Sequence, residues 1–418
     1  MAKIHFLTQG CSANVADSEV MMGLLQEAGH VIVDSLDDAD LIVFNTCTVK
    51  GPTENFFWRK LEILKDRLVL VAGCIPQSEQ DLSRLEEHSL VGTYDIDRIC
   101  EAVNETLNGD RVVFLSKKNR SRLNLPKCRV NPLVEIVPIS HGCLGSCNYC
   151  ITKRARGELH SYPVKDIVKH IRNSDAKQIW LTSQDNGAYG LDIDTDLIEL
   201  LYEIVAIPGD FKVRVGMANP EHVKMLGQDL IKAFKNEKIY KFLHLPVQSG
   251  SDSVLKAMGR KYTVDDFKNI MKSFRKAFPM INIATDIICG FPTETEEDFQ
   301  STLDLIKETK LDIINISRFW PRPGTKAAEM EQQERPEIKR RTKMVTELFH
   351  RVAAETNRRW IGWQGQIMIA ENGKPGSFIG RNFAYKQVVL KDEGLSIGQV
   401  LDVRIDSAMV FDIRGKII

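Results

Sequence analysis

The stretch SHGCLGSCNYC, residues 140–150, decides the fold and places Cys143, Cys147 and Cys150 in one short loop. Three and then two residues separate the thiols, and two glycines make the loop flexible enough to wrap around a small inorganic group. Cubane iron-sulfur clusters usually take four cysteines. A set of three leaves one iron open for another ligand, such as the amine and carboxylate of an amino acid. The spacing therefore predicts a cluster with a vacant coordination site.

A zinc ion is the alternative to an iron-sulfur cluster in the same loop. A zinc site would normally close with a fourth cysteine or histidine, and His141 could supply it. The three-and-two spacing directly after a strand favours the iron-sulfur cluster.

The loop follows the expected strand VEIVPIS (134–140), and strands then alternate with amphipathic helices as far as Arg318. The other expected strands are 178–184, 212–217, 241–247, 281–290 and 312–319. Strand-helix units in series predict an open or closed parallel barrel, whose ligands gather at the carboxyl ends of the strands. We therefore expect the cysteine loop at the top of this barrel.

Upstream of the loop, strands expected at 3–8, 40–45 and 67–73 alternate with helices, the first of them over 16–29. Such a pattern predicts a doubly wound parallel sheet. Cys11, Cys47 and Cys74 each follow one of the three strands by one to three residues. Strand ends of a parallel sheet share one edge, so the three thiols can converge there on a second cluster. Three buried structural cysteines are the alternative.

Downstream of a basic helix at about 335–360, short alternating strands are expected at 365–371, 383–390, 399–407 and 410–416. They predict a small antiparallel barrel of about five strands. The expected domains are therefore 1–110, a basic linker at 111–131, a central barrel at 132–357 and the small barrel at 358–418.

The composition is that of a soluble globular protein, and we expect the protein to be cytoplasmic. The 418 residues hold 56 Lys and Arg against 56 Asp and Glu, so affinity for nucleic acid must come from local basic runs such as 111–129 and 339–343. No signal peptide or membrane anchor is expected. Nine cysteines in such a chain favour metal ligation over disulfides. Cys100, Cys128 and Cys289 lack a partner at suggestive spacing, and Cys289 fits an apolar core strand.

The chain resembles the radical S-adenosylmethionine methylthiotransferases over its whole length. TQGCSANVADSE, FNTCTV and AGCIPQ resemble the N-terminal cluster domain of that family, and residues 140–150 resemble its radical core. LPVQSGSDSVLKAMGRKYT and DIICGFPTETEEDF follow in the family's order, and the C-terminal barrel is similar to a TRAM domain. SQDNGAYG, GMANPEHV and RPGTKAAEM are most similar to the branch that modifies N6-threonylcarbamoyladenosine at position 37 of tRNA.

This resemblance implies two 4Fe-4S clusters and two molecules of S-adenosylmethionine per reaction. One molecule would methylate a sulfur attached to the N-terminal cluster. The other would be cleaved at the cluster of Cys143, Cys147 and Cys150 to give the radical that activates C2 of adenine. The implied partners are the anticodon stem-loop of ANN-decoding tRNAs and an electron donor such as a flavodoxin or ferredoxin.

Provisional roles follow for residues near the barrel mouth and on the C-terminal barrel. Candidates for contacts with the cofactor are Tyr149, Gln184, Asp185, Asn186, Arg214, Gln248 and Ser249. Candidates for contacts with the substrate are Arg318, Phe378, Phe383 and Tyr385. Tyr149 could pack on an adenine, the two arginines could bind a carboxylate, and the barrel aromatics could stack on unpaired bases. Each could instead serve packing or salt bridging.

Three other functions stay open at this point. The substrate could be a ribosomal protein, because the SQD element also resembles that branch, or another derivative of adenosine 37. The protein could also be a cluster carrier without catalysis. Electron carriers normally close a cluster with a fourth cysteine, and both sets here have three.

Overall fold

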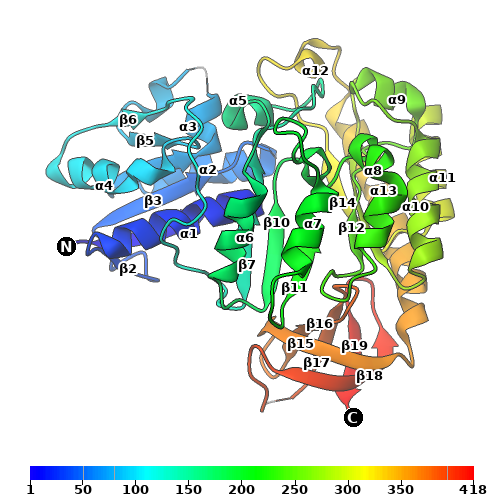
Figure 1. Ribbon diagram of the computed structural model, residues 1–418. Coiled ribbons are helices and arrows are strands. Elements are labelled where there is room, and N and C mark those ends of the chain that lie inside the picture. Colours follow the sequence, from blue (N-terminus) through cyan, green and yellow to red (C-terminus); the bar gives the residue numbers. More distant parts are fainter. Residues whose placement is uncertain (50, 80, 393) are drawn as a thin grey trace.

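The computed structural model describes residues 1–49, 51–79, 81–392 and 394–418. An N-terminal sheet with helices flanks a central parallel barrel, and a small β-barrel lies at the lower end of the central one (Figure 1). The predicted fold class is confirmed.

The N-terminal sheet is built from β1 (Lys3–Thr8), β2 (Val31–Ile32), β3 (Leu41–Thr46), β4 (Val69–Gly73), β5 (Ser89–Gly92) and β6 (Val113–Phe114). The strands pair in parallel in the order β2-β1-β3-β4-β5-β6. β3 and β4 are buried along their whole length, as expected for a sheet covered on both faces. The chain reverses its direction of travel across the sheet between β1 and β3. Sheets of this kind bind their ligands at such a switch point.

Helices α1 (Ser12–Glu27), α2 (Gly51–Ile63), α3 (Cys74–Ser78) and α4 (Ile99–Asn108) cover this sheet. α1 begins at Ser12 instead of Ala16, directly after Cys11. Its first turns carry buried polar residues such as Asn14 and Asp17, because the helix lies between the sheet and the central barrel. That burial on several sides explains why the apolar periodicity misplaced the start of the helix.

The central barrel contains β7 (Val134–Pro138), β10 (Gln178–Thr182), β11 (Lys212–Val215), β12 (Phe242–His244), β13 (Asn282–Cys289) and β14 (Ile313–Arg318). The outer helices are α6 (Val164–Arg172), α7 (Leu197–Val205), α8 (Pro220–Ala233), α10 (Val264–Ala277), α11 (Glu296–Thr309) and α13 (Arg335–Asn357). Parallel pairing joins β7-β10-β11 and β12-β13-β14. A parallel bridge between Val213 and Ile239 links the two groups, so the strands form one partial barrel.

The C-terminal barrel closes in the order β15-β16-β17-β19-β18. Its strands are β15 (Gln364–Asn372), β16 (Phe378–Arg381), β17 (Gln387–Leu390), β18 (Val400–Ala408) and β19 (Ile413–Ile417). The strand predicted at 383–390 is wrong in its first half. Residues 382–386 form a turn in which Asn382 Oδ1 accepts bonds from two backbone amides and Tyr385 takes a φ of 57°. β17 and β19 also pair in parallel, which the antiparallel prediction did not include.

The basic run at 111–129 is largely tied to the rest of the chain. Arg122 is buried in an ion pair with Asp17 of α1, and the partly buried Lys127 pairs with Glu19 of the same helix. Arg341, in the second basic run, is likewise buried against Glu294. These runs therefore hold parts of the protein together, and only their remaining cations face solvent.

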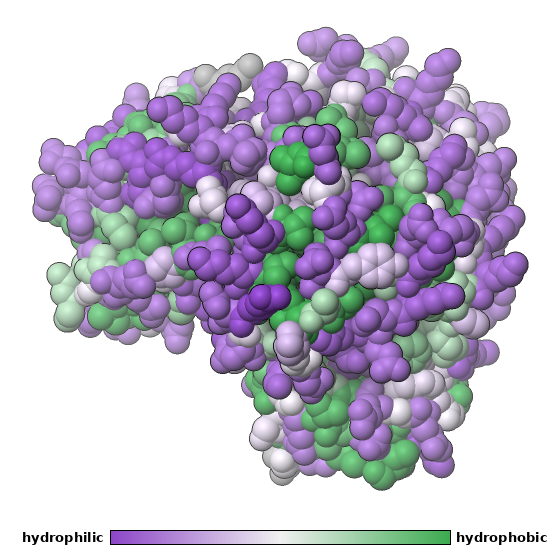
Figure 2. All heavy atoms as spheres, in the orientation of Figure 1, coloured by the Kyte–Doolittle hydropathy of each residue, from purple (hydrophilic) through white to green (hydrophobic). Residues whose placement is uncertain are grey.

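Polar side chains cover most of the surface seen in Figure 2, and apolar ones gather over the C-terminal barrel. Exposed apolar residues of that barrel include Ile397, Val400 and Ile417. Within the described ranges, no helix has both the length and the apolar character required to cross a bilayer.

Candidate functional site

The cysteine loop at 143–150 is closed at its base by a short antiparallel pair. β8 (Ser140–His141) pairs with β9 (His160–Ser161), and Cys143 N donates to Gly157 O at 3.1 Å. Gly142 has a φ of 77°, and a Cβ added to it would lie 1.9 Å from Glu158 O. Glycine is therefore required at the point where the chain leaves β8.

Replacing Gly142 by alanine should disrupt this loop. The methyl group would collide with backbone, so the base of the loop must open, and the three thiols would lose their spacing. We expect the G142A protein to bind roughly half the iron of the wild type, provided that each cysteine set holds one cluster. Iron analysis after anaerobic reconstitution measures this effect. Gly109→Ala is the matched control, because it also has a positive φ but nothing lies within 4 Å of its Cβ position.

The thiols of this loop have two strong hydrogen-bond donors beside them. Gly145 N donates to Cys143 Sγ at 3.3 Å, and Arg260 Nη1 donates to Cys147 Sγ at 3.1 Å. Arg260 is fixed by Asn219 Oδ1 at 3.0 Å and by Tyr262. Burial raises the pKa of the Cys143 thiol to about 12, and the hydrogen bond from Gly145 N opposes that rise, which favours the thiolate that a metal needs. Arg260 was missed from the sequence because it is far from the loop along the chain.

The carboxyl end of β10 presents polar atoms without partners. The side-chain oxygens of Ser183, Gln184 and Asn186 are buried and make no hydrogen bond within the described part of the chain. Buried polar groups normally find partners, so these oxygens suit a polar ligand such as S-adenosylmethionine. Asp185 differs, because its oxygens accept from Gly187 N, Asn219 N and His222 Nδ1. Asp185 thus holds the loop in shape.

Three other predicted contacts lie in different surroundings. Gln248 adopts a φ of 72°, a strained value for a residue with a side chain, at the mouth of the barrel. Ser249 is buried and faces Thr302 of α11, away from the mouth. Tyr149 packs in a small apolar cluster, with its ring 6.5 Å from that of Phe291.

The inner face of the barrel carries a polar row below the mouth. Asp286 on β13 accepts from Asn315 on β14 at 2.8 Å and contacts His244 on β12 at 3.0 Å. Its neighbours Thr285 and Ile287 are buried, and Ile287 belongs to the core between the strands and the outer helices. Because successive side chains of a strand point to opposite faces, Asp286 points into the barrel. This row is partly exposed, so polar groups can reach it from the mouth.

Arg214 and Tyr385 meet at the floor of the barrel. The Arg214 guanidinium lies about 5 Å from the rings of Trp180, Phe242 and Tyr385, and its buried Nε makes no hydrogen bond to any described residue. Tyr385 is buried between the two barrels. Arg318 is exposed at the end of β14, Phe378 is partly buried, and Phe383 is exposed beside Trp363. RNA contacts by these residues stay predictions.

The second cysteine set lies at the switch point of the N-terminal sheet. Cys11 follows β1, Cys47 follows β3 and Cys74 follows β4. A Cβ on Gly10 would lie 2.8 Å from Cys47 Sγ, so the chain after β1 approaches that thiol closely. Asn14 Oδ1 accepts from Cys74 Sγ at 3.6 Å and from Cys11 Sγ at 3.9 Å. The structure thus brings the three thiols together at one sheet edge.

A buried charge network borders these thiols. Asp17 Oδ1 pairs with Arg122 at 2.8 Å, and Asp17 Oδ2 pairs with Arg156 at 2.7 Å. Arg156 also donates to Asn14 Oδ1 at 2.8 Å. His141 lies 3.1 Å from Arg122, and burial together with the two arginines lowers its pKa, so it stays neutral in this network. His141 is therefore engaged here and does not face the loop thiols as a fourth metal ligand.

The two cysteine sets belong to neighbouring surfaces. Ser12, next to Cys11, shares a hydrogen bond of 2.7 Å with Thr182 at the end of β10. α3, which begins at Cys74, packs against α5 (Thr152–Arg156), which follows Cys150. Both sets therefore lie beside the junction between the N-terminal sheet and the barrel.

The donors of both sets are cysteine thiols, which are the usual ligands of iron-sulfur clusters. Among the described residues, no three His, Cys, Asp or Glu side chains converge closely enough to hold one ion. A cluster instead bonds each thiolate to a different iron, so its ligands can stand further apart. Buried positive charge beside one set, and Arg260 beside the other, suit anionic thiolates.

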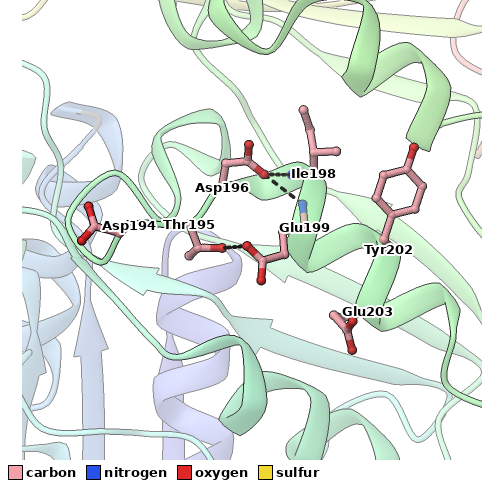
Figure 3. Close-up of a pocket in the computed structure, with 7 residues that line it drawn as sticks. All are labelled: Asp194, Thr195, Asp196, Ile198, Glu199, Tyr202 and Glu203. Atoms are coloured by element: carbon pink, nitrogen blue, oxygen red, sulfur yellow. Dashed lines mark hydrogen bonds between the residues drawn. The ribbon is translucent and has the colours of Figure 1, made fainter.

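A shallow cavity of about 600 Å³ lies elsewhere, near the start of α7. Figure 3 shows it lined by residues 194–203, several of them acidic, with no cysteine of either set. Asp196 caps α7 by accepting from Ile198 N and Glu199 N, and Glu199 accepts from Thr195. These carboxylates serve local structure.

Family models match two parts of the chain. Residues 137–306 match the Radical SAM superfamily, and residues 3–92 match the uncharacterized protein family UPF0004. Among solved structures, a radical S-adenosylmethionine methyltransferase from Kitasatospora setae is similar in fold, with a TM-score of 0.55 and 14% identity over 78% of this chain and 77% of that one.

Relatives extend over the whole chain. A probable threonylcarbamoyladenosine tRNA methylthiotransferase of Pyrococcus horikoshii is 40% identical and covers 100% of both chains. The threonylcarbamoyladenosine tRNA methylthiotransferase of Homo sapiens is 41% identical over 99% of this chain and 74% of its own. The Xenopus laevis enzyme of the same name is also 41% identical, over 99% and 77%.

Proposed function

Since this chain belongs to the threonylcarbamoyladenosine tRNA methylthiotransferase family of radical S-adenosylmethionine enzymes, we propose that it attaches a methylthio group to C2 of N6-threonylcarbamoyladenosine at position 37 of tRNA. The observation that carries this proposal is that two sets of three cysteines lie beside each other, where a hydrogen bond joins Ser12 and Thr182.

Each cysteine set would hold one 4Fe-4S cluster. Cys11, Cys47 and Cys74 would bind the first within residues 1–110, and Cys143, Cys147 and Cys150 the second within residues 132–357. When bound, the clusters and two molecules of S-adenosylmethionine supply the electron, the methyl group and the radical chemistry that an unactivated C–H bond requires.

The protein's own residues position and shield these groups. Arg260 and Gly145 N–H would hold negative charge at the barrel mouth. The unpaired oxygens of Ser183 and Gln184 would bind the polar parts of the cofactor. Asp185, fixed by His222, keeps the loop after β10 in place.

The polar row inside the barrel suits the threonylcarbamoyl group, whose ureido, hydroxyl and carboxylate groups need partners. Replacing Asn315 by leucine should therefore lower kcat/KM for tRNA carrying that group by roughly tenfold, the cost of one lost polar contact. Steady-state assays with threonylcarbamoylated and isopentenylated tRNA measure the preference. An unchanged ratio of the two substrates would remove Asn315 from recognition.

The partners would be tRNA and a protein that donates electrons. Residues 358–418 would bind the anticodon stem-loop of ANN-decoding tRNAs, with exposed Phe383 beside Trp363 as one stacking surface. A flavodoxin or ferredoxin would supply the electron.

A deletion strain tests the substrate assignment. Its tRNA should lack 2-methylthio-N6-threonylcarbamoyladenosine and retain the precursor, as measured by nucleoside mass spectrometry. Normal levels of the modified nucleoside would overturn the proposal. A ribosomal protein that lacks the mass of a methylthio group in the same strain would favour the protein substrate. Loss of another 2-methylthio nucleoside would favour another derivative of adenosine 37.

A further inference from the structure

Arg156 connects the two cysteine sets through a single side chain. It ends α5, the short helix that follows Cys150, yet its side chain contacts residues of α1 in the N-terminal domain. Its Nη2 donates to Asn14 Oδ1 at 2.8 Å and pairs with Asp17 Oδ2 at 2.7 Å. The residue is 1% exposed, so this position is fixed by packing on all sides.

The Arg156 charge lies one side chain away from the N-terminal thiols. Asn14, which accepts from Arg156, also accepts from Cys74 and Cys11. A positive charge thus lies against the thiols from outside their own domain.

The network around Arg156 carries an excess of positive charge. Two guanidinium groups, of Arg122 and Arg156, share the one carboxylate of Asp17. Nη1 of Arg156 is buried and has no well-directed hydrogen-bond partner in the ranges that the structure describes. A buried, uncompensated cation is costly, and an anionic group held by the three thiols would neutralise it.

We propose that Arg156 is a positioning residue for the N-terminal iron-sulfur cluster, holding positive charge and a hydrogen-bond donor against it. This inference rests on the proposed function, which puts a cluster on Cys11, Cys47 and Cys74. Positive charge favours the reduced, more negative state, so Arg156 raises the reduction potential of that cluster. It also fixes the cluster relative to the loop of Cys150.

The test compares the reduction potentials of both clusters in the full-length, reconstituted protein. Redox titrations followed by electron paramagnetic resonance would be run with and without S-adenosylmethionine, which perturbs the cluster on the 143–150 loop and identifies its signal. In Arg156→Gln, we expect the reduction equilibrium constant of the other cluster to fall about tenfold, or 59 mV for one electron. The cluster that responds to S-adenosylmethionine should keep its potential, and Arg156→Lys should restore most of the shift.

Arg122→Gln is the matched control. Arg122 pairs with the same carboxylate, but its other contacts are Thr93 and His141. If R122Q shifts the potential as much as R156Q, or if R156Q shifts nothing, the proposal is overturned. If R156Q fails to hold the first cluster while R156K and R122Q hold it, positioning by charge is supported. Equal loss of iron from R156Q and R122Q would overturn it, because the Asp17 network alone would then be responsible.

Iron analysis of the wild type separates this inference from the proposed function. A chain that binds about four irons instead of about eight has no second cluster, and both proposals fail. A chain that binds about eight irons, with identical potentials in the wild type and R156Q, refutes only the role of Arg156.

Discussion

Methylthiolation of tRNA should disappear in Cys74→Ala, while S-adenosylmethionine is still cleaved to 5′-deoxyadenosine. Cys74 belongs to the N-terminal set. The loop of Cys143, Cys147 and Cys150 belongs to the central barrel instead, where the β8-β9 pair closes it and Arg260 donates to one of its thiols. Loss of one thiolate from a set of three should therefore remove one cluster and spare the other. Anaerobic assays with dithionite, followed by nucleoside and 5′-deoxyadenosine analysis, measure both activities.

Two variants bracket this prediction. Cys150→Ala should abolish both activities, because it removes a ligand from the cluster that would cleave the cofactor. Cys100→Ala should change neither, because Cys100 is a half-buried thiol of the same N-terminal domain that donates to Leu24 O. Methylthiolation at wild-type rate by C74A would rule out a role for the N-terminal set in the reaction.

The second large effect concerns stability. Asp17→Ala should destabilise the cluster-free protein by about 3–5 kcal/mol, because it leaves two buried guanidinium groups without their shared carboxylate. Removing one partner of a buried ion pair lowers the free energy of unfolding by more than the intact pair adds to it, because the remaining charges cannot reach water. Urea unfolding followed by circular dichroism measures the change.

Glu101→Ala is the control for that experiment. Glu101 pairs with Arg98 at 2.7 Å on the surface, and water replaces such a partner readily. Its unfolding midpoint should stay at the wild-type value. A D17A protein as stable as E101A would show that Arg122 and Arg156 are solvated or paired in another way.

The sequence predicted the fold correctly where one pattern of apolar residues dominates a segment. Runs such as residues 134–140 and 281–290 have apolar β-branched residues bounded by turns, and they became β7 and β13. Residues 383–386 misled the same reasoning, because Tyr385 is apolar enough for a strand but lies in a turn that packs against the central barrel.

The two cysteine sets differ in how far sequence could predict them. The loop set is compact, so spacing alone indicates its chemistry. The dispersed set depended on the argument that ends of parallel strands share an edge, and the thiols after β1, β3 and β4 do lie together. That these six cysteines bind clusters stays a prediction.

Residues that act across domains had no local signal. Arg260, Asn14 and Arg156 lie near the thiols only after the chain has folded, and no spacing relates them to the cysteines they approach. Arg122 belongs to the basic run at 111–129, which was expected to be a linker and a possible source of affinity for nucleic acid, whereas its side chain is buried against Asp17. A run of basic residues in the sequence does not show whether their side chains are exposed. That depends on where the folded chain places the acidic residues that pair with them.

With two clusters that each have a vacant coordination site, this chain should convert N6-threonylcarbamoyladenosine in tRNA to its 2-methylthio derivative. The most direct measurement is nucleoside mass spectrometry of threonylcarbamoylated tRNA incubated with the anaerobically reconstituted protein, dithionite and S-adenosylmethionine. This reaction should yield the 2-methylthio nucleoside, together with both 5′-deoxyadenosine and S-adenosylhomocysteine. Release of 5′-deoxyadenosine with an unchanged nucleoside would contradict it.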